Sequence, residues 1–134
     1  IASRLSANGV YLSNIIDRTT TPSLAVSVAT TLSKVFPAVD IWVAGGEQGA
    51  TTNYVVAAWR DVRSAYRPDT ISVEASVMNA GEAVQSQIVV WRRVDVAAAT
   101  TVWPDACAAV LTDDWAPVDR LIVGRRVCDR AGAP

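Results

Sequence analysis

The pattern of apolar and polar residues along the first 44 positions predicts a strand, a helix and a second strand. Residues 10–16 are mainly apolar and rich in residues that fit a pleated, buried strand. Thr21-Pro22 then offers a hydroxyl N-cap followed by proline in the first helical turn. The helix expected behind it carries an apolar stripe at helical spacing, formed by Leu24, Val28, Leu32 and Val35 and widened by Ala25, Ala29 and Phe36. Pro37 ends this helix, and residues 39–44 are expected to form the second strand.

A third strand is expected at residues 53–59, after a loop. Three glycines between residues 45 and 49 could cradle a phosphate, but a phosphate loop leads into a helix and usually contains a lysine. A mobile loop is therefore the favoured interpretation. Because a helical crossover joins parallel strands, the strands at 10–16 and 39–44 are predicted to run in the same direction. The third strand follows without a helix and is predicted to be antiparallel.

The pattern weakens after residue 60. Residues 69–79 alternate in polarity, which favours a half-exposed strand, although a helix is an open alternative there. Another strand is expected at residues 88–91, and an alanine-rich helix at residues 96–103.

Composition and charge exclude several classes of function. Twelve basic and thirteen acidic residues give a net charge of −1, which provides no basic surface for nucleic acid. The chain has no histidine, so acid–base chemistry would fall to carboxylates, tyrosines or cysteines. No run approaches the ~20 apolar residues of a membrane span, so no membrane association is expected.

The chain contains two cysteines, Cys107 and Cys128. A zinc site needs about four ligands, so no metal site is predicted. A disulfide bond is an open alternative, but two reduced thiols in a cytoplasmic protein are the more common case and the favoured interpretation. The predicted location is therefore the cytoplasm.

Two groups of polar residues are candidates for chemistry. Asn14 and Asp17 come at the carboxyl end of the first strand, which is where open α/β sheets bind their ligands. Asp113 and Asp114 form an adjacent carboxylate pair, for which helix capping and turn chemistry are favoured over catalysis or cation binding. Residues 1–5 read as the last turn of a helix, so the chain is predicted to be a fragment of a longer protein.

Two stretches of the sequence resemble a known family. One runs from Leu5 through Gly9-Val10-Tyr11-Leu12-Ser13-Asn14-Ile15-Ile16-Asp17 to the helix that ends at Pro37, and the other is Leu111-Thr112-Asp113-Asp114-Trp115-Ala116-Pro117-Val118-Asp119-Arg120-Leu121. Together they resemble the carboxyl-terminal half of a spermidine synthase-like protein. That family consists of polyamine aminopropyltransferases with the fold of class I S-adenosylmethionine-dependent methyltransferases. The resemblance covers about residues 1–60 and 110–122, and its second motif is the more specific one.

The resemblance implies an α/β fold, namely the carboxyl-terminal part of a Rossmann-like methyltransferase sheet. Residues 1–60 would supply its last strands, with the antiparallel strand 53–59 between the other two. Residues 61–124 would be a family-specific extension, and residues 125–134 a tail. The family transfers an aminopropyl group from decarboxylated S-adenosylmethionine to putrescine, and its acidic residues bind and deprotonate the diamine.

The family's glycine-rich nucleotide loop, its ribose-binding acid and its catalytic aspartate loop have no counterpart in this chain. The resemblance therefore implies no cofactor bound by this chain alone, and no activity without an amino-terminal half. Asn14, Asp17 and Tyr54 match positions on the amine side of the family's site and are predicted to bind substrate. Asp113 and Asp114 match a family motif to which no role is assigned, and no catalytic residue is predicted.

Three functions remain as hypotheses: a truncated aminopropyltransferase-like domain, a non-catalytic assembly domain, or part of a methyltransferase with another substrate. Missing partner strands would leave an apolar strand edge at residues 10–16, and such an edge pairs readily with another chain. Homo-oligomerisation, or association with a missing amino-terminal half, is therefore predicted.

Overall fold

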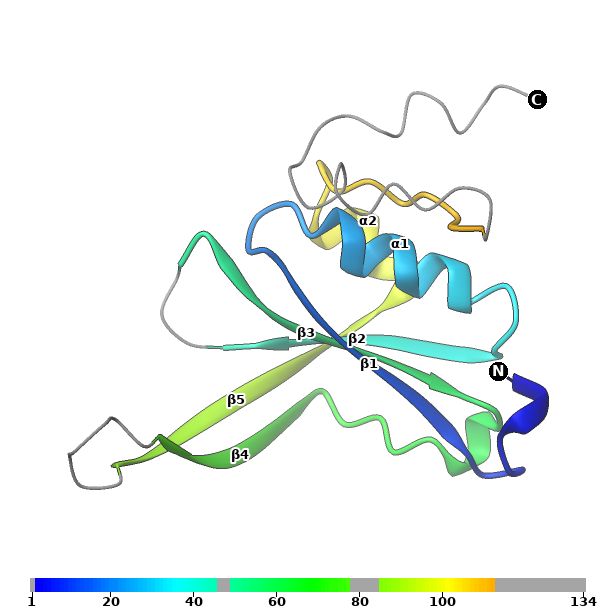
Figure 1. The fold of residues 1–134 in the computed structure, drawn as a ribbon, viewed down its shortest axis with the longest axis horizontal. Coiled ribbons are helices and arrows are strands. Elements are labelled where there is room, and N and C mark those ends of the chain that lie inside the picture. The colour runs from blue at the N-terminus through cyan, green and yellow to red at the C-terminus, as the bar shows by residue number, and fades with distance from the viewer. Residues whose placement is uncertain (1, 46–48, 78–84, 113–134) are drawn as a thin grey trace.

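The computed structural model describes residues 2–45, 49–77 and 85–112. In this part of the chain, five strands form one sheet, and a helix packs on one of its faces (Figure 1). The strands are β1 (Val10–Arg18), β2 (Ala38–Ala44), β3 (Thr51–Trp59), β4 (Thr70–Val77) and β5 (Gln85–Asp95). The helices are α1 (Ser23–Leu32) and the short α2 (Ala99–Val102), with 3-10 turns η1 (Ala2–Arg4), η2 (Val62–Ser64) and η3 (Val96–Ala98).

The sheet is antiparallel throughout, so the predicted Rossmann-like α/β fold is wrong. Its strand order is β1-β3-β2-β5-β4, and every neighbouring pair is antiparallel. The crossover through α1 does make β1 and β2 run in the same direction, because β3 pairs antiparallel with both. The predicted position of the third strand, antiparallel between the other two, is therefore confirmed. A parallel sheet would continue from β2 through further strand–helix units, whereas here β5 pairs antiparallel with the free side of β2.

One face of the sheet buries the hydrophobic core beneath α1. The core contains Ile15, Val39, Ile41, Tyr54, Val56, Ala58 and Val94 from the strands, and Ala25, Val26 and Ala29 from α1. The predicted stripe is confirmed at Ala25 and Ala29, whose small side chains allow the helix to lie close to the strands. Val35 is 65% exposed, so its predicted place in that stripe is wrong, because the helix has already ended at Leu32.

The outer side of α1 is covered by the extended segment 107–111, through a row of hydroxyl groups that we call the hydroxyl ladder. The N–H groups of Cys107, Ala109 and Leu111 donate to Ser23 Oγ (2.8 Å), Ser27 Oγ (3.1 Å) and Thr31 Oγ1 (2.8 Å), respectively. Four helical residues rise about 6 Å and two extended residues about 6.6 Å, so every second N–H meets the next hydroxyl. This match explains how α1 buries polar side chains on its side away from the sheet.

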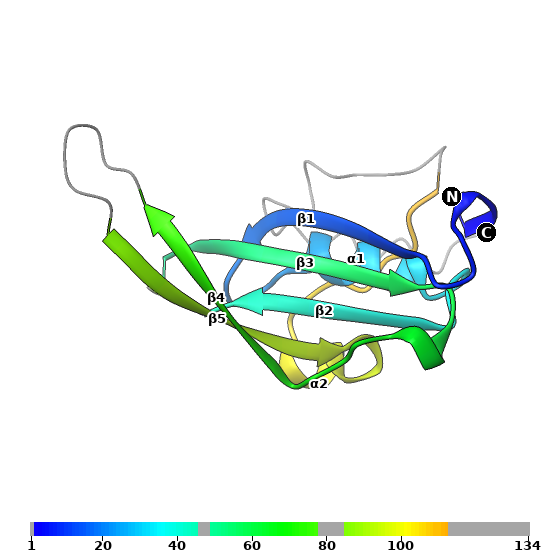
Figure 2. The same cartoon turned by 90° about the horizontal axis from the view of Figure 1, so that it is seen from below.

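β4 and β5 form a long hairpin at the other end of the sheet (Figure 2). Residues 70–77 pair with β5 along their whole length, so the strand alternative is correct for this part of the predicted segment 69–79. Residues 78 and 79 lie outside the described residues. The expected strand at 88–91 is the middle of β5, and the expected helix at 96–103 appears as η3 followed by α2. β1, β2 and β3 precede residue 60, and β4 and β5 follow it, yet all five belong to one sheet.

The hydroxyl ladder predicts a specific effect of Ser27→Ala. Ser27 is fully buried, and its Oγ both accepts from Ala109 N–H and donates to the Cys107 carbonyl (3.1 Å). The substitution removes both of these buried hydrogen bonds, so we expect the free energy of unfolding to fall by about 1–3 kcal/mol in urea denaturation. Ser33→Ala, an exposed serine just beyond the same helix, is the matched control. Equal effects of the two substitutions would contradict a stabilising role of the ladder.

Candidate functional site

Asp17, one of the predicted substrate-binding residues, lies at the end of β1 and supports the start of α1. Its carboxylate is 1% exposed and accepts hydrogen bonds from the N–H groups of Leu24 (2.8 Å), Ala25 (3.0 Å) and Arg18 (2.7 Å). The N-cap residue of α1 is Pro22, which makes no side-chain cap. Asp17 therefore satisfies helix N–H groups that would otherwise have no acceptor. Burial raises the pKa of Asp17, and the three N–H bonds oppose that rise.

Tyr54, on β3, lies on the same side of the sheet as Asp17. Its side chain is fully buried, its Oη donates to the carbonyl of Arg18 (2.9 Å), and its ring forms a T-shaped contact with Trp103, with centroids 5.9 Å apart. Burial, and secondarily the nearby charge of Asp17, raise the pKa of Tyr54 to about 12. The phenol therefore acts as a protonated hydrogen-bond donor that ties β3 to the end of β1.

Asn14, the third predicted substrate-binding residue, lies on the opposite face of the sheet. Successive side chains of a strand alternate between faces, so residues 14 and 17 cannot share one. Asn14 is exposed, whereas Asp17 and Tyr54 are buried on the α1 face. The structure thus brings two of the three predicted residues together. A role of these residues in binding an amine stays a prediction, and Asp113 and Asp114 lie outside the described residues.

A hollow of about 600 Å³ lies beside this region, where β1 ends and β3 begins. It is lined by Ile16, Asp17, Arg18, Thr19, Thr20, Gly49, Ala50 and Thr51. The hollow coincides with the polar residues that follow the first predicted strand. Both oxygens of Asp17 already accept hydrogen bonds from the N–H groups of Arg18, Leu24 and Ala25. The carboxylate therefore uses its hydrogen bonds to hold the start of α1.

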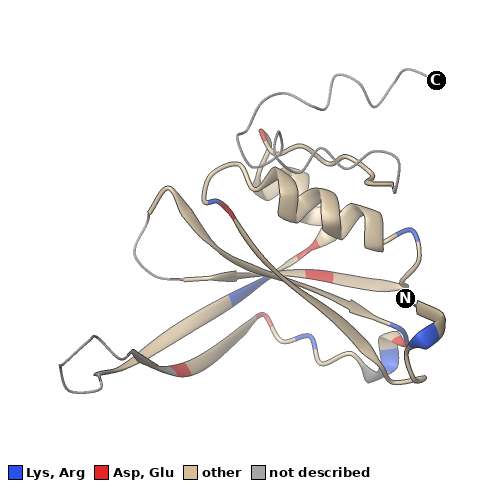
Figure 3. Cartoon of the chain, viewed as in Figure 1, with Lys and Arg blue, Asp and Glu red and all other residues tan. Residues whose placement is uncertain are grey.

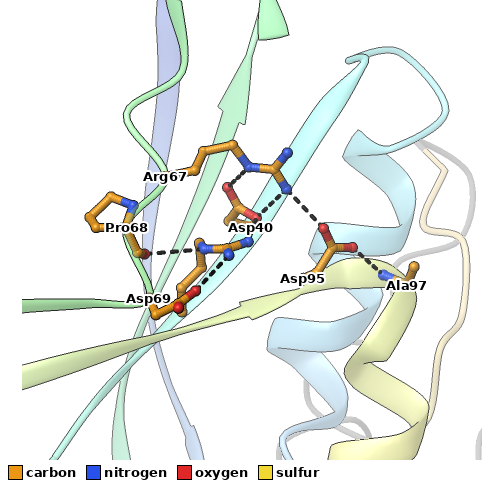
Figure 4. Close-up of polar contacts among 7 residues, drawn as sticks. Asp40, Arg67, Pro68, Asp69, Asp95 and Ala97 are labelled. Carbon is orange, nitrogen blue, oxygen red and sulfur yellow. Dashed lines mark hydrogen bonds and ion pairs between the residues drawn. The ribbon is translucent and has the colours of Figure 1, made fainter.

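A cluster of charged residues, not identified from the sequence, forms on the other face of the sheet. Charged residues occur on β2, on β5 and in the segment before β4, while α1 carries none (Figure 3). Asp40 on β2 is fully buried, and both of its oxygens accept from Arg67, whose Nε and Nη2 lie 2.7 Å away (Figure 4). Arg67 Nη2 also donates to Asp95 (2.8 Å). The sequence carries one signal of this cluster: an ionisable residue stands between Val39 and Ile41 in a strand of apolar residues.

Arg93 extends this charged cluster along β5. Its Nη1 lies 3.4 Å from Asp40, its Nη2 donates to Asp69 (3.0 Å), and its Nε donates to the carbonyl of Pro68 (3.1 Å). The pKa of Arg67 is raised chiefly by its hydrogen bonds to Asp40. The arrangement anchors the segment 60–69 over the sheet face that α1 does not cover.

Beside this anchor, the uncovered face contains an apolar groove of about 280 Å³, which we call the tryptophan groove. It is lined by Leu12, Trp42, Val55, Ala57, Trp59, Tyr66, Ile71, Val73 and Trp91. The groove draws residues from all five strands and from the anchored segment. It is the second feature of this face that the sequence did not predict, because its residues are distant in the chain.

Other features limit the chemistry available. No group of three or more potential metal ligands occurs among the residues that the structure describes, and no helix there is long and apolar enough to cross a membrane. Cys107 is disulfide-bonded, so the favoured prediction of a reduced thiol is wrong at this position. Cys128 lies outside the described residues.

Comparisons with protein-family models, curated proteins and solved structures gave no match. The geometry of the chain is therefore the basis for assigning a function.

The buried phenol predicts an unusual base titration. Because the folded pKa of Tyr54 lies above the ordinary value of 10, stability should be lost as pH rises from about 10 through about 12. Tyrosinate absorbance should therefore show one phenol that ionises near pH 12 or together with unfolding, and Tyr54→Phe should remove that step alone. A Tyr54→Phe protein whose titration matches the parent's would contradict the buried hydrogen bond.

Proposed function

We propose that this chain is a non-catalytic assembly domain that pairs with a second copy of itself through β1. The proposal is carried by one observation, the unpaired outer side of β1. β1 is an edge strand of nine residues, and no strand in the described part of the chain pairs with its outer side. Edge strands of this length commonly carry lysine, proline or a bulge that prevents pairing with other chains. Residues 10–17 contain no lysine, proline or glycine.

The backbone of β1 is oriented for such pairing. Thr19 N–H donates to the Ala50 carbonyl (3.1 Å), and Arg60 N–H donates to the Gly9 carbonyl (3.1 Å), in register with the β1–β3 ladder. In an antiparallel pair, residues that exchange both hydrogen bonds with the partner alternate with residues whose backbone groups point away. The odd-numbered residues of β1 therefore bond to β3, and its even-numbered residues direct their N–H and C=O groups outward.

The side chains of those even-numbered residues form a self-complementary pattern. Leu12 is 60% exposed and Ile16 is 62% exposed, and Asn14 lies midway between them. An antiparallel pair centred on Asn14 places Leu12 opposite the partner's Ile16, and Asn14 opposite the partner's Asn14. Such self-matching is what a two-fold interface requires, and cross-strand apolar pairs stabilise it. Shifting the register by two residues would instead place Leu12 opposite the partner's Asn14 in one direction, or opposite the partner's Arg18 in the other.

The candidate polar residues support an assembly role over catalysis by this chain. The carboxylate of Asp17 and the hydroxyl of Tyr54 hold α1 and β1 in place, as described above. Aminopropyl transfer from decarboxylated S-adenosylmethionine to a small amine, or methyl transfer within a longer protein, stays a prediction. A cytoplasmic location also stays a prediction, and the disulfide bond of Cys107 weighs against it because such bonds are rare in reducing compartments.

A charge-swap experiment at Asn14 tests the assembly. If Asn14 lies on the two-fold axis, Asn14→Lys and Asn14→Asp each place like charges opposite one another, so each protein should sediment as a monomer. An equimolar mixture of the two should form a heterodimer, because opposite charges then meet. Sedimentation velocity over a wide concentration range measures both outcomes, with circular dichroism to verify the fold.

Asn53 provides the matched control. It is an exposed asparagine on the same face, one strand inward, directly opposite Ile16 on β3. Asn53→Lys and Asn53→Asp should therefore remain dimers. A monomeric parent protein at every concentration, or Asn14 variants that dimerise as the parent does, would refute the proposed pairing.

A further inference from the structure

β4 forms the second edge of the sheet, at the opposite side from β1. It pairs with β5 along its length, and no strand in the described part of the chain pairs with its outer side. Residues 70–77 contain no lysine, proline or glycine, and Glu74 is their one charged residue. The backbone groups of such an edge are available to an added strand. Because β1 and β4 share no residue, this edge is separate from the strand proposed for assembly.

The even-numbered residues of β4 direct their backbone groups outward. Arg93 N–H donates to the Asp69 carbonyl (2.9 Å), in register with the β4–β5 ladder. In an antiparallel pair, residues that bond to the partner strand alternate with residues whose backbone groups point away, so the odd-numbered residues of β4 bond to β5. The residues whose N–H and C=O groups point outward are therefore Thr70, Ser72, Glu74 and Ser76.

The two faces of β4 present different side chains to an added strand. Val94 of β5 belongs to the core beneath α1, so the even-numbered residues of β5, and those of β4 opposite them, project from the α1 face. On that face, exposed hydroxyl side chains flank Glu74, which forms no ion pair among the residues that the structure describes. Ile71 and Val73 project from the other face, where they line the tryptophan groove. One face of the edge is therefore polar with a single carboxylate, and the other is apolar.

β4 is fixed in place before a partner arrives. Its ladder with β5 is continuous from residue 70 to residue 77. Arg93 also donates through Nη2 to the Asp69 carboxylate (3.0 Å) and through Nε to the Pro68 carbonyl (3.1 Å), which holds the chain where the strand begins. An added peptide therefore pays the entropic cost of ordering itself, but not of ordering β4.

Glu74 disfavours a second copy of this chain as the partner. A two-fold antiparallel pair of β4 strands aligns most of their length only when it is centred on Val73 or on Glu74. Centring on Glu74 places the two carboxylates directly opposite one another, and centring on Val73 makes them diagonal neighbours on the same face. Like charges in these positions oppose pairing, whereas a basic side chain opposite Glu74 supports it.

We propose that the outer edge of β4 binds an extended peptide segment of another protein, with alternating apolar and polar residues and a basic residue opposite Glu74. The segment adds to β4 as an antiparallel strand and bonds to its even-numbered residues. Its apolar side chains continue the row formed by Ile71 and Val73, and its basic side chain pairs with the carboxylate on the α1 face. Main-chain hydrogen bonds provide the affinity of such an added strand, and the alternating side chains provide its selectivity.

A fluorescein-labelled peptide of sequence Thr-Val-Lys-Val-Thr-Val-Thr has this pattern and serves as the probe. Fluorescence anisotropy should show saturable binding to the parent protein. The same peptide with glutamate in place of its lysine should bind about three- to tenfold more weakly, because like charges then meet. Glu74→Lys should reverse this order of affinities. Asp105→Lys changes an exposed acid away from β4 by the same charge and should leave the order unchanged.

Ser72→Pro tests the backbone hydrogen bonds. The N–H of Ser72 points away from β5, and proline is tolerated at such a position of an edge strand. Losing this donor should weaken the lysine peptide by about tenfold or more, while circular dichroism verifies the fold. N-methylation of the peptide's lysine should also weaken binding, because its N–H donates to the Glu74 carbonyl. N-methylation of the valine opposite Val73 is the matched control, since the N–H of that valine points away from β4.

Asn14→Lys separates this proposal from assembly through β1. This variant should bind the lysine peptide as the parent does, and the parent should bind it even if it proves monomeric. Absence of saturable binding would overturn the peptide site, as would an order of affinities that Glu74→Lys leaves unchanged, or binding that Ser72→Pro leaves unchanged. Self-association of the Asn14→Lys protein that Ser72→Pro abolishes would assign the edge to a second copy of the chain and would also overturn the proposal.

Discussion

The insertion of β3 between β1 and β2 is the constraint on which the remaining structure depends. Because β3 pairs with both strands, the helical crossover that joins them cannot place them side by side. β2 is left with one free side, which β5 occupies, and β1 is left as an edge. The same insertion therefore determines the antiparallel sheet, the position of the β4–β5 hairpin and the strand that is open for assembly.

The alternation of side chains along the inserted strand then separates two environments. Tyr54 and Val56 project into the core beneath α1, while Val55 and Ala57 project into the tryptophan groove. β2 behaves in the same way, since Ile41 belongs to the core and Trp42 to the groove. A sheet with both faces apolar is buried on both sides in most proteins. In the part of the chain that the structure describes, only one face has a helix, and the other is partly covered by the segment that Arg67 anchors.

Local patterns predicted much of this fold, and contacts distant in sequence account for what they missed. The strand–helix–strand unit and the antiparallel third strand follow from apolar spacing and from Pro22 and Pro37. The pairing of β5 with β2 leaves no local signal in the sequence. The Rossmann-like sheet that the family resemblance implied is therefore wrong at this position. The spacing of Ser23, Ser27 and Thr31 resembles an ordinary polar helix face, and only the arrival of residues 107–111 explains its burial. Asn14 and Asp17 are three residues apart. An odd separation along a strand places two side chains on opposite faces of the sheet, so the sequence already excluded a shared face for this pair.

The central claim, that β1 pairs inward through its odd-numbered residues and is open outward through its even-numbered ones, can be measured by amide hydrogen exchange followed by NMR. In dilute protein, the N–H groups of Ser13 and Ile15 should exchange slowly, and those of Leu12, Asn14 and Ile16 rapidly. At high concentration, Leu12, Asn14 and Ile16 should become protected while the protection of Ser13 and Ile15 changes little. Uniform protection along β1 at all concentrations, or rapid exchange at Ser13 and Ile15, would contradict the account.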